Sequence, residues 1–159
     1  MNDYVPHNLP TLSEVLHRPI SGPVSLANLR VFMLQNNCIE ILNFLEEAKG
    51  YRESYCAICV QLGPISHHSI QRPEVQELLI LWRHLVLTYI LPGSSRGIDI
   101  TNHERDQFAA VSSMVIPPSP NILDSPVRRL EQLLADAIFP AFLSNQCENM
   151  FVRGRTLMF

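Results

Sequence analysis

Charge is scarce in this sequence, and no stretch of it is strongly basic. Only 17% of the 159 residues are charged, and the formal net charge is −3. Neither nucleic acid nor a polybasic attachment to a membrane is therefore expected. The first ten residues, MNDYVPHNLP, lack the basic and apolar regions of a secretory signal. The apolar stretch within residues 73–91 is interrupted by Arg83 and His84 and is shorter than the about 20 residues of a membrane span, so we expect no span.

The sequence also lacks the short motifs of common enzymes. It contains no Walker A sequence, no G-x-G-x-x-G and no G-x-S-x-G elbow. Ser66, His67 and His68 with a carboxylate would supply the residue types of a hydrolase site, but no strand framework supports one. We therefore expect an interaction domain that is not an enzyme and that uses no cofactor.

Cysteine is sparse, and four cysteines do not indicate disulfides in an intracellular chain of this size. Cys56 and Cys59 form half of a zinc-binding pattern, which His67 and His68 could complete. Adjacent histidines cannot easily reach one tetrahedral ion, and the two cysteines lie in an apolar, helix-like stretch. We interpret them as small buried hydrophobic residues in a metal-free helix. A small zinc protein is the alternative.

Hydrophobic residues make up 47% of the chain, which is enough for one domain with a single core. Residues 73–91 are apolar on nearly all sides of a helix, so we expect a buried central helix whose Leu81 and Leu85 face packed neighbours. Pro73 suits its first position, and Pro92-Gly93 ends it.

Cap and breaker residues predict further helices on both sides of this one. Threonine and glutamate three residues apart form two capping boxes, and a serine provides a further N-cap. A helix from Cys38 to about Lys49 should stop at Gly50, with a further segment over 51–63. Pro140 should kink or break the last long helix, which opens at Ser125. The pattern predicts an all-α chain of seven to nine helices, with cap residues at Thr11–Glu14, Ser25 and Thr101–Glu104.

Three segments resemble one known family. The first segment is residues 32–52, FMLQNNCIEILNFLEEAKGYR. In the family the corresponding segment begins with Phe-Leu, continues through a short polar break to Glu-Asn-Ile-x-Phe-Trp, and ends with a tyrosine next to a basic residue. The second segment, residues 89–105, resembles the part of the family in which a helix ends, a Val-Asn-Leu-Asp loop follows, and the next helix starts with Thr and Arg. Residues 133–144 resemble its Leu-Met and Arg-Phe-Leu-x-Ser patterns. In order and spacing the chain is similar, over about residues 11–144, to the regulator of G-protein signalling (RGS) domain, most closely its fungal branch.

The resemblance implies an RGS-like bundle of about nine helices around a buried central helix. We expect residues 1–10 to form an N-terminal arm, 11–145 the domain and 146–159 a C-terminal tail. RGS domains bind the switch regions of a Gα subunit and accelerate its GTP hydrolysis without catalytic residues or metal ions of their own. The resemblance therefore implies a monomeric inhibitor of G-protein signal transduction, cytoplasmic and brought to the inner face of the plasma membrane by Gα.

Several residues of the family's Gα-binding surface are replaced in this chain. The family's Glu-Asn pair falls on Glu40 and Ile41, and its second asparagine falls on Asp99, while its leucine is retained as Leu133. Its later arginine falls on Ala141. An RGS-like interaction module without GTPase-activating activity is therefore the alternative function. The surface implied by the resemblance comprises Asn37, Cys38, Glu40, Ile41, Asp99, Thr101, Asn102, Leu133, Asp136, Ala137 and Ala141.

Overall fold

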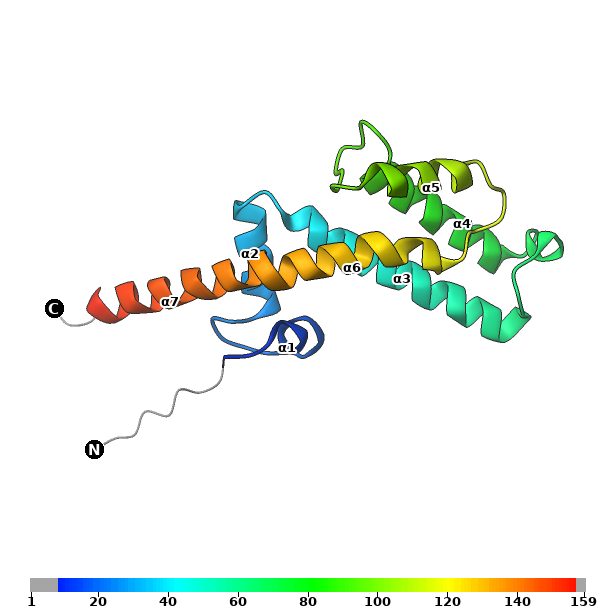
Figure 1. Cartoon of the computed structure of the whole chain (residues 1–159). Coiled ribbons are helices and arrows are strands. Elements are labelled where there is room, and N and C mark those ends of the chain that lie inside the picture. Colours follow the sequence, from blue (N-terminus) through cyan, green and yellow to red (C-terminus); the bar gives the residue numbers. More distant parts are fainter. Residues whose placement is uncertain (1–8, 157–159) are drawn as a thin grey trace. The chain divides into compact units, whose positions relative to one another are not determined.

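The computed structural model describes residues 9–156, and every regular element in this range is a helix (Figure 1). The all-α fold class predicted from the sequence is confirmed. The α-helices are α1 (Leu12–His17), α2 (Leu26–Gln35), α3 (Ile39–Leu62), α4 (Pro73–Leu85), α5 (Asn102–Ser112), α6 (Asp124–Leu133) and α7 (Phe139–Thr156). Short 3-10 turns cover His67–Ser69 and Pro120–Leu123, and π turns cover Val86–Ile90 and Leu134–Ile138.

The number of helices differs from the expected nine. The first π turn prolongs α4, and α6, the second π turn and α7 follow one another without a break. Counted as continuous helices, the described residues form six. The chain divides into two compact units, one made of the residues up to Ile39 with those from Leu133 onward, the other of Glu40–Gln132. Within the described range, no helix is long and apolar enough to cross a membrane.

The helix starts lie where the cap residues predict them. Thr11 and Thr101 each accept a hydrogen bond from the backbone N–H three residues on, and Glu14 and Glu104 accept one in return. Ser25 accepts one from the N–H of Asn28 at the start of α2. These bonds satisfy N–H groups that a helix start leaves without a partner, so local sequence alone fixes these three starts.

Helix α3 does not stop at Gly50, so that prediction is wrong. Ala48 and Tyr51, on either side of the glycine, are buried in the core of the second unit. A glycine inside a helix costs only about 1 kcal/mol, which the burial of these neighbours offsets. The helix ends instead at Gly63, whose φ of 77° is the left-handed conformation that suits glycine after a helix.

Helix α4 is buried on one side only, and not on nearly all sides as the sequence suggests. Trp82 and Leu85 are 2% and 1% exposed, whereas Leu81 is 45% and Ile80 is 63% exposed. The expectation that Leu81 faces packed neighbours is therefore wrong, and the one for Leu85 is confirmed. The prediction of burial on nearly all sides failed because α4 carries apolar residues on its exposed face. The hydrophobicity of a side chain does not reveal which elements cover it.

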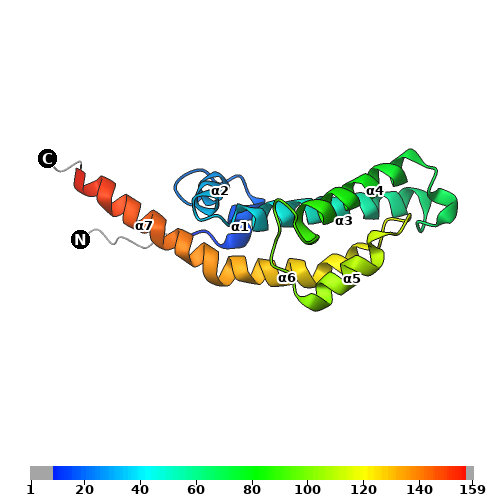
Figure 2. The ribbon, with the colours of Figure 1, turned by 90° about the horizontal axis from the view of Figure 1, so that it is seen from above.

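Aromatic rings join the helices of the second unit. Trp82 on α4 lies between Tyr51 on α3 and Phe108 on α5, with ring centres 5.3 and 5.8 Å away. In the π turn that follows α4, Tyr89 meets Phe44 edge to face at 5.6 Å. Helices α3 and α4 lie side by side and run in opposite directions (Figures 1 and 2). These rings give the second unit a core that involves three of its helices.

The first unit has a core of its own, built from α1, α2 and α7. Val15, Leu29, Met33 and Phe142 are fully shielded from solvent. The Phe142 ring also lies 5.6 Å from that of Phe32 on α2. This unit therefore folds around contacts between residues from the two ends of the described chain.

Pro140 does not break the last helix. Proline lacks the N–H of a regular helical bond and crowds the carbonyl four residues earlier. The π turn immediately before it accommodates this defect, since the N–H of Phe139 donates to the carbonyl of Leu134, five residues back. The helix then continues as α7 through Thr156. The loosened turn is thus the structural response to the proline.

Candidate partner-binding site

The loop from Leu91 to Thr101, between α4 and α5, is held at several points of its backbone. Gly93 adopts a φ of 78°, which turns the chain away from the end of α4. The N–H of Ile98 then donates to the carbonyl of Tyr89 at 3.0 Å, and Ile100 is buried. The loop borders a small, open polar pocket of about 350 Å³ that reaches Arg105.

A buried carboxylate fixes the end of this loop. Glu104 is 2% exposed and accepts hydrogen bonds from the backbone N–H of Thr101 at 2.8 Å and from the hydroxyl of Ser125 at 2.9 Å. Arg129 on α6 pairs with the same carboxylate at 2.8 Å and also donates to the carbonyl of Asp99 at 2.6 Å. One arginine thus ties the loop and α5 to α6.

The balance of forces on Glu104 keeps it ionised. Burial alone raises the pKa of its carboxyl group, but the hydrogen bonds from Thr101, Arg129 and Ser125 outweigh burial and lower the pKa below the ordinary 4.5. The carboxylate and the guanidinium therefore both carry charge near neutral pH. A charged, hydrogen-bonded pair is a firmer anchor for the loop than neutral groups would be.

This anchoring leaves one part of the predicted surface exposed. Asp99, Thr101 and Asn102 all have exposed side chains, although the backbone at Asp99 and Thr101 is fixed. The three lie within four residues of one another, where the loop enters α5. The structure thus brings them together on a preorganised segment.

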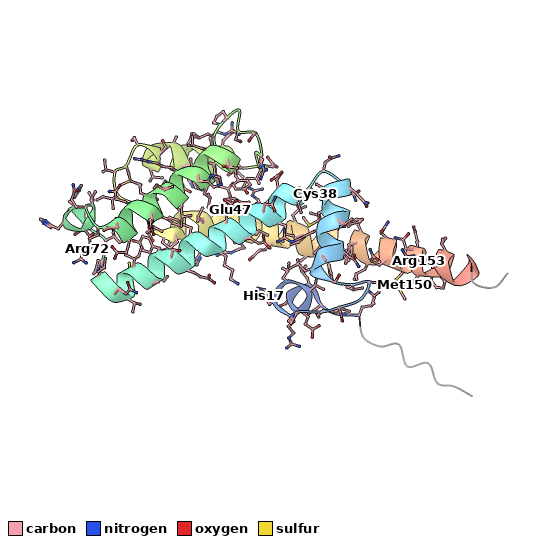
Figure 3. All side chains as sticks on the ribbon, turned by 180° about the vertical axis from the view of Figure 1, so that it is seen from behind. His17, Cys38, Glu47, Arg72, Met150 and Arg153 are labelled. Atoms are coloured by element: carbon pink, nitrogen blue, oxygen red, sulfur yellow. The ribbon has the colours of Figure 1, made fainter. Side chains whose placement is uncertain are left out.

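The polar break between α2 and α3 has a defined geometry. Asn37 adopts a φ of 56°, its N–H donates to the carbonyl of Leu34, and the N–H of Cys38 donates to that of Met33. This pair of bonds is a Schellman motif, in which asparagine takes the left-handed position usual for glycine. Asn37 is exposed and Cys38 half-buried, and Cys38 lies at the corner where α2 gives way to α3 (Figure 3). Burial raises the pKa of the Cys38 thiol.

The next two predicted residues lie in the first turn of α3. Glu40 is half-buried and accepts a hydrogen bond from the side chain of Asn43 at 3.3 Å. Ile41 is also half-buried and packs against the core of the second unit. The Ile41 side chain therefore has a packing role of its own.

The remaining predicted residues lie near the π turn that precedes α7. Leu133 is 43% exposed, a large apolar side chain on the surface. Asp136, Ala137 and Ala141 are exposed as well, whereas Leu134 is fully buried. The predicted set is thus divided between the two compact units, with Glu40, Ile41, Asp99, Thr101 and Asn102 in the second and the other six in the first.

The residues that position the loop were not predicted as site residues. The spacing of Thr101 and Glu104 revealed the capping box, but nothing in it shows that the carboxylate is buried. Arg129 stands 25 positions after Glu104 in sequence, and no local pattern shows that α6 packs beside the start of α5. Two adjacent arginines, Arg128 and Arg129, were the only signal, and the sequence does not show which of them meets a buried carboxylate.

Helix α3 carries further polar and sulfur-containing side chains outside this surface. Cys56 and Cys59 are helical as expected, but Cys56 is exposed, so its interpretation as a buried hydrophobic residue is wrong. In the described part of the chain, no group of three or more potential ligands could hold a metal ion. Glu47 accepts a hydrogen bond from the Tyr89 hydroxyl at 2.7 Å and lies on α3 beside α4 (Figure 3).

The chain matches no protein-family model, and a search of curated proteins finds no match.

Proposed function

We propose that the chain is an RGS-like regulator that binds the switch regions of a Gα subunit and accelerates GTP hydrolysis. The observation that carries the proposal is the loop before α5, where the buried Glu104 and its half-buried partner Arg129 fix the backbone while Asp99, Thr101 and Asn102 stay exposed. A preorganised exposed segment loses little conformational freedom on binding. The three sequence segments similar to RGS domains supply the identity of the partner.

The proposed mechanism requires no catalytic group from this chain. Gα already supplies an arginine that stabilises the transferred phosphate and a glutamine that orients the attacking water. A partner that binds the mobile switch loops more tightly in the reacting arrangement lowers the barrier by that difference in binding energy. A protein that favours the reacting arrangement of the switch loops in this way needs rigid contact residues. The site of action would be the cytoplasmic face of the plasma membrane, where Gα resides.

The alternative, a module that binds without activating, is favoured by two side chains. Ile41 is partly in the core and offers no amide, and Asp99 carries a carboxylate that accepts hydrogen bonds without donating any. A partner group left unpaired by either residue costs about 1–3 kcal/mol. We therefore expect activation weaker than the family's contact residues would give.

The proposal predicts tighter binding to the reacting state of Gα. The chain should bind Gα loaded with GDP and a mimic of the transferred phosphate more tightly than Gα with GDP alone, measured by titration calorimetry. Leu133→Ala should weaken this binding about tenfold, since Leu133 is a large exposed apolar side chain of the proposed surface that a bound partner would bury.

Ile80→Ala is the matched control, because Ile80 is an exposed aliphatic residue of α4 outside the proposed surface. It should leave the affinity unchanged. Equal weakening by both substitutions, or no binding to any Gα in a panel, would reject the proposed interface.

A further inference from the structure

An open groove of about 850 Å³ lies between α5 and α6 in the second unit. Its apolar part is formed by Ala110 and Val111 of α5 and by Ile122 of the 3-10 turn that precedes α6. Both helices lie on the same side of the second unit in the view of Figure 2. The volume is in the range of sites that hold a short peptide segment or a drug-sized ligand.

Three amide side chains also line the groove, those of Gln107, Asn121 and Gln132. All three are exposed, and the structure gives none of them a side-chain hydrogen bond to another described residue. Each amide can donate and accept, which is the pattern of a peptide backbone. Amides spaced along an apolar floor therefore suit an extended peptide.

The charges of the groove leave one cation in excess. Asp124 pairs with Arg52, and Arg129 pairs with Glu104. Arg128, which lines the same groove, has no hydrogen bond or ion pair to any described residue. The Nε of Arg129 is in addition a buried donor without a partner in the described residues. The unpaired guanidinium of Arg128 indicates an acceptor of negative charge as its partner.

We propose that this groove binds an extended peptide segment in which an aspartate or glutamate stands next to an aliphatic residue. The carboxylate would pair with Arg128, the aliphatic side chain would cover Val111 and Ile122, and the backbone would bond to the amides. A single carboxylate fits better than a phosphate, because the Asp124 carboxylate lies on the same lining and repels a doubly charged group. None of the residues of the proposed Gα surface lines this groove, although Arg129, which anchors the loop before α5, does.

A capped peptide with the sequence Gly-Ser-Gly-Glu-Leu-Gly-Ser-Gly is a direct probe. Titration into the isotope-labelled chain should shift the backbone amide resonances of α5 and α6 in NMR spectra. Replacing the peptide's Glu by Gln, or Arg128 by Gln, should each weaken binding about threefold to fivefold, since an exposed ion pair contributes up to about 1 kcal/mol. Arg83→Gln, at an exposed arginine of α4 outside the groove, should change nothing.

Several outcomes would overturn the proposal. Equal binding of the Glu and Gln peptides by the unaltered chain would overturn it. This comparison uses no protein variant, so it does not depend on whether a variant folds. Inorganic phosphate that binds as tightly as the Glu peptide would make the groove an anion site instead. Shifts that grow with protein concentration in the absence of peptide would make a second copy the occupant. An absence of shifts at millimolar peptide would likewise reject it.

Discussion

Asn37 shows at the scale of one residue how a conformation and a surface can depend on the same side chain. Its φ of 56° lies in the left-handed region, which asparagine tolerates and most other residues avoid. The residue also belongs to the proposed Gα surface. Two substitutions can separate the two roles.

We predict that Asn37→Ala lowers the free energy of unfolding by about 1 kcal/mol, since alanine pays the left-handed penalty without a compensating local bond. Asn37→Gly should be neutral or slightly stabilising, because glycine adopts this φ freely. Urea unfolding followed by circular dichroism measures both. A glycine variant as unstable as the alanine variant would show that the backbone conformation is not what matters here.

Glu104 gives the fold a predictable response to acid. Its pKa is lowered in the folded chain relative to the ordinary 4.5, so its contribution to stability is complete above about pH 4.5. The contribution is lost as the pH falls through the lowered folded value. Glu104→Gln should reduce the free energy of unfolding by about 1–3 kcal/mol at pH 7, because Arg129 loses its charged partner.

The difference between the variant and the unaltered chain should then shrink below pH 4.5, as urea titrations from pH 7 to acid would show. Glu77→Gln, at an exposed position of α4, is the control and should leave stability unchanged at pH 7. If the Glu104→Gln difference stayed constant from neutral pH into acid, the ionised carboxylate would have no role in holding the loop.

At the scale of elements, α4 shows what an apolar pattern can and cannot predict. Its start at Pro73 and its end before Gly93 followed from residues whose backbone preferences are local. The buried face of α4 could not be predicted in this way. Ile80, Leu81 and Leu85 have similar hydrophobicity, and only tertiary contacts distinguish them. The same reason explains α3, where burial around Gly50 overrode a local stop signal.

We predict that Leu85→Ala lowers the free energy of unfolding by about 2–5 kcal/mol, as truncation of a buried leucine does. Leu81→Ala, four residues earlier on the same helix, should cost less than about 1 kcal/mol because Leu81 is 45% exposed. Denaturant unfolding of both variants measures the difference, and each variant serves as the control for the other because both replace leucine by alanine. Similar losses at both positions would contradict the one-sided burial of α4.

At the scale of the whole molecule, sequence reasoning identified exposed residues of the candidate surface but not what holds them in place. Asp99, Thr101 and Asn102 were found through the loop's resemblance, and their exposure agrees with a contact role. Arg129, Ser125 and the burial of Glu104 depend on α5 and α6 meeting, which no local pattern reveals. The packing of Ile41 against the core was hidden for the same reason.

This packing changes which substitution best restores the family's contact residues. Replacing both Ile41 and Asp99 by asparagine would match the family, but Ile41→Asn also removes a half-buried hydrocarbon from the core surface and should destabilise the fold. Asp99 is exposed, and its backbone is fixed by Arg129 independently of its side chain. Asp99→Asn therefore changes the contact group alone.

The most direct measurement is single-turnover GTP hydrolysis by a panel of Gα subunits, with the unaltered chain and with Asp99→Asn. We predict that the unaltered chain accelerates hydrolysis by at least one Gα and that Asp99→Asn accelerates it further, about tenfold for each 1.4 kcal/mol of recovered contact energy. Adding Ile41→Asn should raise the rate again only if the double variant remains folded by circular dichroism. If neither the unaltered chain nor Asp99→Asn accelerated hydrolysis by any Gα, the activator function would be contradicted.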